Sequence, residues 1–137
     1  MDTNAEPGQN KQKILWVEDD NFLNDLIATK LSKLHYQLTL AKSAEETYSK
    51  IASDRPNVII LDMVLPGEDG FQILEKLKAN PEWKDIPVIV FSNLFQRSDI
   101  DKAKALGAVK YFIKATLSID KMVKEIEQTL KELSQIK

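Results

Sequence analysis

The sequence predicts an α/β fold in which five strands alternate with five helices, a (βα)5 arrangement around one doubly wound parallel sheet. Two observations carry this prediction. Short apolar runs recur along the chain, and each is followed by a segment whose apolar residues fall at helical spacing. The third run, 58–61, is apolar throughout, which is typical of a strand buried on both faces of a parallel sheet.

The bounds of the expected elements follow from the apolar spacing and from residues that begin or end helices. Ser43 is a candidate N-cap with Glu46 completing a capping box, and Gly107 is a candidate C-cap. The last strand is less uniformly apolar, which indicates a sheet edge. Five alternating strands favour the flavodoxin-like order 2-1-3-4-5, which makes the first and third strands neighbours. Strands are expected at 14–17, 36–40, 58–61, 87–91 and 108–113, and helices at 21–34, 43–53, 70–80, 98–106 and 118–133.

Size and composition exclude several classes of protein. The 137 residues allow one domain, expected over 13–134 after a flexible tail over 1–12. With 19 basic and 21 acidic residues there is no basic stripe, so no direct nucleic-acid binding is expected. The absence of cysteine excludes disulfides and thiolate metal sites. No apolar run approaches the ~20 residues that cross a membrane, and a signal-peptide pattern is missing, so we expect a cytoplasmic protein.

Chemically active side chains stand where four of the predicted strands end. Glu18 and Asp19 follow the first strand, Asp62 the third, Ser92 the fourth and Lys114 the fifth. Because the carboxyl ends of parallel strands meet at one edge, we expect these groups to lie together. Crowded carboxylates without histidine or cysteine favour Mg²⁺ or Mn²⁺. A carboxylate nucleophile, a metal site, a hydroxyl and a fixed cation are what phosphoryl transfer onto Asp62 would need.

Each of these residues also has a simpler structural interpretation. The acidic run 18–20 could cap the following helix, and within it Asp20 is the expected N-cap. Ser92 alone could be a polar loop residue, and Lys114 a surface lysine. Tyr111 alone would be read as packing, and His35 as an exposed turn residue after a helix. The agreement of four strand ends favours the chemical interpretation.

Four segments carry these residues, in a specific order and spacing. They are 14–20 (Ile-Leu-Trp-Val-Glu-Asp-Asp), 61–70 (Leu-Asp-Met-Val-Leu-Pro-Gly-Glu-Asp-Gly), 88–92 (Val-Ile-Val-Phe-Ser) and 111–114 (Tyr-Phe-Ile-Lys). They resemble the acidic motif, the phosphorylation-site motif and the two remaining motifs of the receiver domain of two-component response regulators. The resemblance extends from Lys13 to about Leu133, essentially the whole chain.

The resemblance implies a role for each matching residue. Asp62 would be the phosphoacceptor, Ser92 would hydrogen-bond one phosphoryl oxygen, and Lys114 would pair with another. The ligands of Mg²⁺ or Mn²⁺ would be Glu18, Asp19, Asp62 and the backbone carbonyl of Val64.

The same resemblance implies how the signal would pass on. Phosphorylation would draw Ser92 inward and change the rotamer of Tyr111, which would alter the surface of the fourth helix, fifth strand and fifth helix. The phosphoryl group would come from a histidine kinase or a histidine phosphotransfer protein, and a downstream effector would read the altered surface. Homodimerisation through that surface is a further option that the sequence leaves open.

One departure from the family pattern and one further feature concern the residues around the site. Ala115 stands where proline usually follows the lysine, commonly after a cis peptide bond. Because a cis bond before a residue other than proline costs ~3 kcal/mol, we expect a trans bond and a locally different loop. Val64 and Leu94 place apolar side chains beside the phosphorylation site, and we expect them to limit attack by water and lengthen the life of an acyl phosphate.

Two other functions stay open at this point. One is a receiver that binds a partner without being phosphorylated, which Ala115 weakly favours and the complete set of site residues disfavours. The other is a Mg²⁺-dependent phosphohydrolase with an aspartyl nucleophile. Met63 and Val64 supply no second acid for such an enzyme, and no insertion is long enough for a substrate-covering cap.

Overall fold

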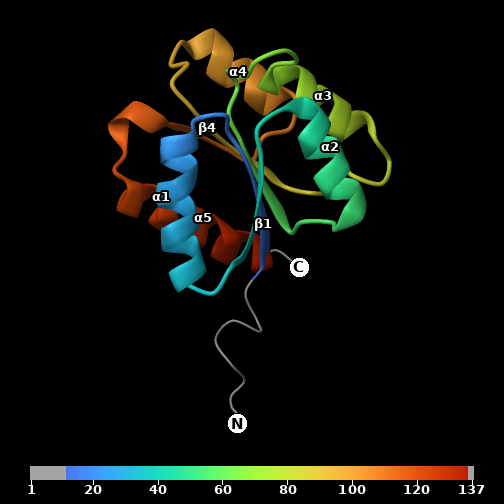
Figure 1. Ribbon diagram of the computed structural model, residues 1–137. Helices are drawn as coiled ribbons and strands as arrows, with labels where there is room; N and C mark the ends of the chain where they lie inside the picture. Colours follow the sequence, from blue (N-terminus) through green and yellow to red (C-terminus); the bar gives the residue numbers. More distant parts are fainter. Residues whose placement is uncertain (1–11, 136–137) are drawn as a thin grey trace.

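A five-stranded parallel sheet in the order β2-β1-β3-β4-β5 forms the centre of the computed structural model, which describes residues 12–135 (Figure 1). The predicted (βα)5 fold and strand order are confirmed. The strands are β1 Lys13–Val17, β2 Gln37–Ala41, β3 Val58–Leu61, β4 Val88–Ser92 and β5 Lys110–Ile113. The helices are α1 Asn21–Lys33, α2 Ala44–Ser53, α3 Gly70–Ala79, α4 Arg97–Ala105, α5 Ile119–Ser134 and a short 3₁₀ turn, η2, at Lys114–Thr116.

Helices cover both faces of the sheet. Because successive side chains of a strand point to opposite faces, β1 sends Leu15 and Val17 toward α2, α3 and α4, and Ile14 and Trp16 toward α1 and α5. Figure 1 shows α1 and α5 together on one side of the sheet and α2 and α3 on the other. Every residue of β3 is buried, as its apolar run predicts. The site described below is therefore anchored on strands that the core holds from both sides.

Polar side chains begin the first two helices. Asp20 caps α1 by accepting hydrogen bonds from the backbone N–H groups of Phe22 and Leu23, as predicted. Ser43 caps α2 by accepting from the N–H of Glu46. The expected capping box is incomplete here. The Glu46 carboxylate accepts from Lys42, one residue before the N–H that a capping box uses.

The start of α3 fixes the loop that follows the central strand. Asp69 and Gln72 form a complete capping box there, which was not predicted. Gly70 packs directly against the end of β3, where a Cβ atom would collide with the carbonyl oxygen of Asp62 and with Met63. Glycine at this position therefore lets α3 begin against the strand end that carries Asp62.

The outer parts of the sheet are less buried. All four residues of β5 are only partly buried, which agrees with its predicted edge position. Gly107 follows α4 with φ 115, a backbone conformation that favours glycine. None of the helices within residues 12–135 is long and apolar enough to cross a bilayer. The predicted tail over 1–12 lies outside the described residues except for Gln12, so the boundary at 13 stays a prediction.

Candidate functional site

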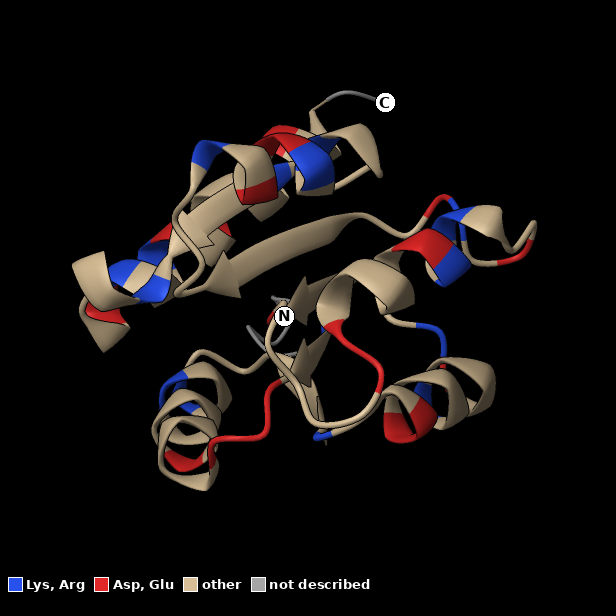
Figure 2. Ribbon diagram, turned by 90° about the horizontal axis from the view of Figure 1, so that it is seen from above, with Lys and Arg blue, Asp and Glu red and all other residues tan. Residues whose placement is uncertain are grey.

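An ion-paired cluster lies at the carboxyl edge of the sheet. The Lys114 ammonium nitrogen is 2.5 Å from Oε1 of Glu18 and 2.9 Å from Oδ2 of Asp62. The side chains of Glu18 and Asp62 are 4% and 6% exposed, and that of Lys114 is 13% exposed. Glu18 and Asp62 meet because β1 pairs with β3, and Lys114 reaches them from the turn that follows the edge strand β5, although it is 96 and 52 positions away from them in the sequence. The acidic segment that leads from β1 into α1 is visible at this edge in Figure 2.

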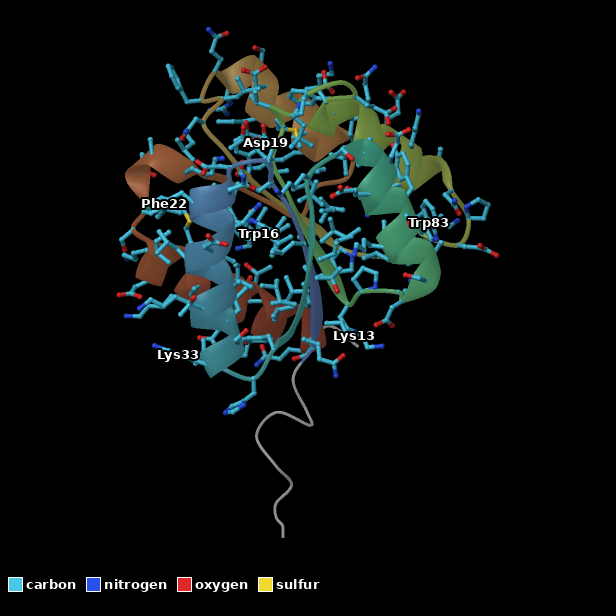
Figure 3. The ribbon with its side chains drawn as sticks, in the orientation of Figure 1. Lys13, Trp16, Asp19, Phe22, Lys33 and Trp83 are labelled. Carbon is cyan, nitrogen blue, oxygen red and sulfur yellow. The ribbon has the colours of Figure 1, made fainter. Side chains whose placement is uncertain are left out.

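Asp19 adds a third carboxylate to the cluster. Oxygen atoms of Glu18, Asp19 and Asp62 lie within 4.8 Å of one another, with Asp19 exposed and the other two buried. The carboxylates outnumber the ammonium of Lys114 by two, which is the charge of one divalent cation. Oxygen donors at this spacing fit a hard ion such as Mg²⁺ or Mn²⁺. Figure 3 labels Asp19 near the point where β1 ends.

The loop after Asp62 turns back toward its carboxylate. The backbone N–H of Val64 donates to Oδ1 of Asp62 at 3.1 Å, while Oδ2 is held by Lys114. Both carboxylate oxygens are thus oriented by the protein. That the carbonyl of Val64 is a metal ligand stays a prediction.

Burial and charge oppose each other within the cluster. Burial raises the pKa of Glu18 above its usual range, and the negative charge of Asp62 adds to this, while the hydrogen bond from Lys114 opposes it. Burial lowers the pKa of Lys114, but its hydrogen bonds to Glu18 and Asp62 and their charges more than offset this, so the pKa is raised. Lys114 therefore stays a cation, which is the state that a negatively charged ligand requires.

A buried asparagine that the sequence analysis missed supports the acidic loop. Asn24 is 3% exposed. Its side-chain oxygen accepts from the indole N–H of Trp16 at 2.8 Å, and its amide nitrogen donates to the carbonyl of Glu18 at 2.9 Å. Figure 3 shows Trp16 between α1 and the sheet. Asn24 stands at helical spacing from Ile27 and Leu31, the other buried residues of α1, and this spacing was the sequence signal that Asn24 is buried.

Ser92 and Tyr111 lie next to the cluster but bond to a different loop. Ser92 is fully buried at the end of β4, and its hydroxyl accepts from the N–H of Leu94 at 3.3 Å. The hydroxyl of Tyr111 donates to the carbonyl of Leu94 at 2.7 Å. Burial raises the pKa of Tyr111, and hydrogen bonding with Ser92 opposes this. Within residues 12–135 no hydrogen bond joins Ser92 to Asp62, so its contact with a phosphoryl group stays a prediction.

The segment after Lys114 has the expected trans peptide bond, since the described residues contain no cis bond. The chain forms the short turn η2 there, and the backbone N–H of Ala115 donates to the side-chain oxygen of Asn93 at 2.7 Å. Lys114 reaches Asp62 although alanine, not proline, follows it.

His35 takes no part in the site. It is exposed, with φ 69, in the turn that follows α1. Figure 3 labels Lys33, just before this turn, at the end of the molecule opposite Asp19. The prediction of an exposed turn residue is confirmed.

Comparison with known proteins gives this arrangement a family context. The sequence-family model of the response regulator receiver domain matches residues 14–127 of this chain. The transcriptional regulatory protein KdpE of Staphylococcus aureus is 35% identical over 104 residues, which are 76% of this chain and 44% of KdpE. The chain therefore spans less than half the length of this curated relative.

Two solved structures are similar in both sequence and fold. The Mn(2+)-bound form of response regulator Rcp1 has a TM-score of 0.77 at 29% identity, covering 85% of this chain and 91% of Rcp1. The phosphorylated cyanobacterial phytochrome response regulator RcpA has a TM-score of 0.78 at 28% identity, covering 86% of this chain and 92% of RcpA. The family match spans Glu18, Asp62 and Lys114 alike, and this chain belongs to the response regulator receiver domain family.

Proposed function

We propose that Asp62 accepts a phosphoryl group from a phosphohistidine, in a reaction that depends on Mg²⁺ or Mn²⁺, and that the phosphorylated chain signals through α4, β5 and α5. Receiver domains of response regulators interact with histidine kinases and effector domains, and they bind these ions at an acidic pocket. The observation that carries the proposal is the ammonium of Lys114 held between the carboxylates of Glu18 and Asp62.

Phosphoryl transfer onto Asp62 is a single displacement at phosphorus. A carboxylate oxygen of Asp62 forms a bond to phosphorus as the phosphorus–nitrogen bond of the phosphohistidine breaks, and the departing imidazole keeps the electron pair and takes up a proton. Such a reaction chiefly needs positioning and charge neutralisation. The Val64 N–H and the Lys114 ammonium position the carboxylate before the donor arrives.

The side chains of the site then have separate tasks. Glu18, Asp19 and Asp62 would hold the divalent cation, which neutralises charge on the phosphoryl oxygens when bound. Lys114 would exchange its contact with Asp62 for one with a phosphoryl oxygen, since its ammonium is already beside that carboxylate. Ser92 would give up its bond from Leu94 to donate to a second oxygen.

The movement of Ser92 provides a route to the output surface. Leu94 accepts from Tyr111 and donates to Ser92, so the loop between β4 and α4 connects the hydroxyl near the phosphoryl group to an aromatic side chain on β5. A local charge event would thereby bias an element that has two arrangements. A histidine kinase or phosphotransfer protein is the proposed donor, and a downstream effector is the proposed reader.

The test is incubation with acetyl phosphate and Mg²⁺, followed by mass spectrometry of the intact protein. We expect the mass of one phosphoryl group to be added in wild type, and no addition in Asp62→Asn. Asp69→Asn is a matched control on the same loop, because asparagine also caps helices. A wild type that gains no mass would favour a receiver that works without phosphorylation. Multiple turnover of a simple phosphate ester would instead favour the phosphohydrolase.

A further inference from the structure

Two hydrogen bonds join the loop after β4 to the edge strand and the turn that follows it. The side-chain oxygen of Asn93 accepts from the backbone N–H of Ala115 at 2.7 Å. The carbonyl of Leu94 accepts from the hydroxyl of Tyr111, also at 2.7 Å. The second bond belongs to the proposed switch, whereas the first has no role in the function described so far.

The Asn93–Ala115 bond connects the immediate neighbours of two site residues. Asn93 follows Ser92, whose hydroxyl is proposed to contact a phosphoryl group, and Ala115 follows Lys114, whose ammonium is proposed to do the same. The two partners are 22 positions apart in sequence, and they lie just beyond Ser92 and Ile113, the last residue pair of the β4–β5 ladder, so the bond extends the pairing of these strands into the loops that follow them. It requires a backbone N–H at position 115, which proline would lack.

We propose that Asn93 is a positioning residue for phosphoryl binding, because its bond to Ala115 extends the pairing of β4 with β5 past the strand ends and so fixes the backbone of Lys114 relative to that of Ser92. This inference rests on the proposed function of the site. Lys114 has a long, flexible side chain whose far end is held by two carboxylates. The bond from Asn93 fixes the backbone at its near end, which lowers the ordering cost of binding a phosphoryl group.

The metal ligands offer an internal comparison. Glu18 and Asp19 follow β1 and Asp62 follows β3, so their backbones do not depend on the Asn93–Ala115 bond. Loss of the bond should therefore weaken the binding of a phosphoryl group much more than the binding of the metal ion. A purely structural role for Asn93 would lower the two affinities together or lower only stability.

The experiment measures the Kd of beryllofluoride, a mimic of the phosphoryl group, for the full chain at saturating Mg²⁺. We expect Asn93→Ala to weaken beryllofluoride binding about three- to fivefold, as the loss of one exposed hydrogen bond implies. The Kd of Mg²⁺ alone and the urea midpoint should stay close to wild type. Gln96→Ala is the matched control on the same loop, because Gln96 makes no side-chain hydrogen bond to the helix it precedes.

A double-variant cycle isolates the bond itself. In an Ala115→Pro background, position 115 has no N–H that could donate a hydrogen bond to Asn93. Asn93→Ala should then have no further effect on beryllofluoride binding. An unchanged Kd in the single Asn93→Ala variant, or an equal loss in both backgrounds, would overturn the inference and leave the proposed function intact. A wild type that binds no beryllofluoride at all would overturn the proposed function, and the inference with it.

Discussion

The site has two halves that are held in different ways. We call residues 18–20 and 62–64 the acid half, and residues 92–94 and 111–115 the switch half. The acid half follows the central strands β1 and β3, whose residues Ile14 to Val17 and Val58 to Leu61 are buried. The switch half includes the edge strand β5, which is partly buried throughout, and the exposed residue Ala115. The acid half is fixed by packing, whereas the switch half, apart from Ser92 at the buried end of β4, is held mainly by a few hydrogen bonds worth about 1 kcal/mol each.

This difference suggests a division of labour. A nucleophile and its metal site need a geometry that does not change between the free and phosphorylated states. A switch needs two arrangements of similar free energy. Placing the first in the sheet centre and the second at its edge satisfies both requirements within one small domain. Lys114 belongs to the switch half by sequence and to the acid half by contact, so it connects the two.

The largest effect is expected from removing this connection. Lys114→Ala leaves Glu18 and Asp62 buried without a counter-charge, so without metal the free energy of unfolding should fall by about 3–5 kcal/mol. Urea unfolding in the presence of EDTA measures this. Lys110→Ala, which removes an exposed ion pair with Glu132, should lower the free energy of unfolding far less. Equal losses of unfolding free energy in the two variants would show that the buried ion pairs of Lys114 matter no more than the exposed ion pair of Lys110.

A comparable loss should follow from crowding the acid half. Gly70→Ala places a methyl group against the carbonyl of Asp62, so we expect about 3 kcal/mol of destabilisation and slower phosphorylation. The matched control is Gly67→Ala, where φ is 75 but nothing lies within 4 Å, and the cost should be about 1 kcal/mol. Thermal unfolding compares the two, and a Gly70→Ala protein as stable as the control would show that the acid half is not fixed by packing.

Metal binding at the acid half should stabilise the folded protein. Mg²⁺ at 100-fold excess over its Kd should add about 2.7 kcal/mol to the free energy of unfolding, because it binds only the folded site. It should also change the fluorescence of Trp16, which is linked through Asn24 to the backbone of Glu18. A flat fluorescence titration in both wild type and Asp62→Asn would count against the metal assignment.

The smallest effect concerns water near the phosphoryl group. Val64 and Leu94 each stand two residues after a site residue, Asp62 and Ser92, and Val64 is 55% exposed while Leu94 is partly buried. Leu94→Glu should speed phosphate release roughly threefold, which corresponds to less than 1 kcal/mol of barrier. Phe95→Glu, on the next and more exposed residue, should leave the rate unchanged. If timed phosphate release is no faster in Leu94→Glu, shielding by this side chain is not what sets the lifetime.

The sequence predicts the fold well because its signals are local and consistent. Apolar runs such as 58–61 can only be buried on both faces, and helical spacing with caps at Asp20 and Ser43 defines the intervening helices. Parallel pairing then places the strand ends side by side, which is why Glu18, Asp62 and Lys114 could be expected to meet. Predicted bounds differ from the structure by one or two residues in several elements, because helix and strand ends depend on the hydrogen bonds of the loops beside them.

The missed residues are those whose roles depend on packing between distant segments. Asn24 reads as one polar residue of a helix, and only its position against Trp16 makes it a bridge. Asn93 reads as a loop residue, since its partner Ala115 is 22 positions away. The hydrogen-bond partner of Ser92 also could not be predicted, because a hydroxyl can bond to its own loop or to a ligand.

The measurement that tests the division most directly is a pair of NMR titrations on the ¹⁵N-labelled protein. Mg²⁺ alone should shift amide signals of residues 18–20 and 62–64, and beryllofluoride added afterwards should shift those of residues 92–94, 111–115 and α4. Beryllofluoride shifts confined to the acid half, or Mg²⁺ shifts that already include Tyr111 and α4, would contradict the account.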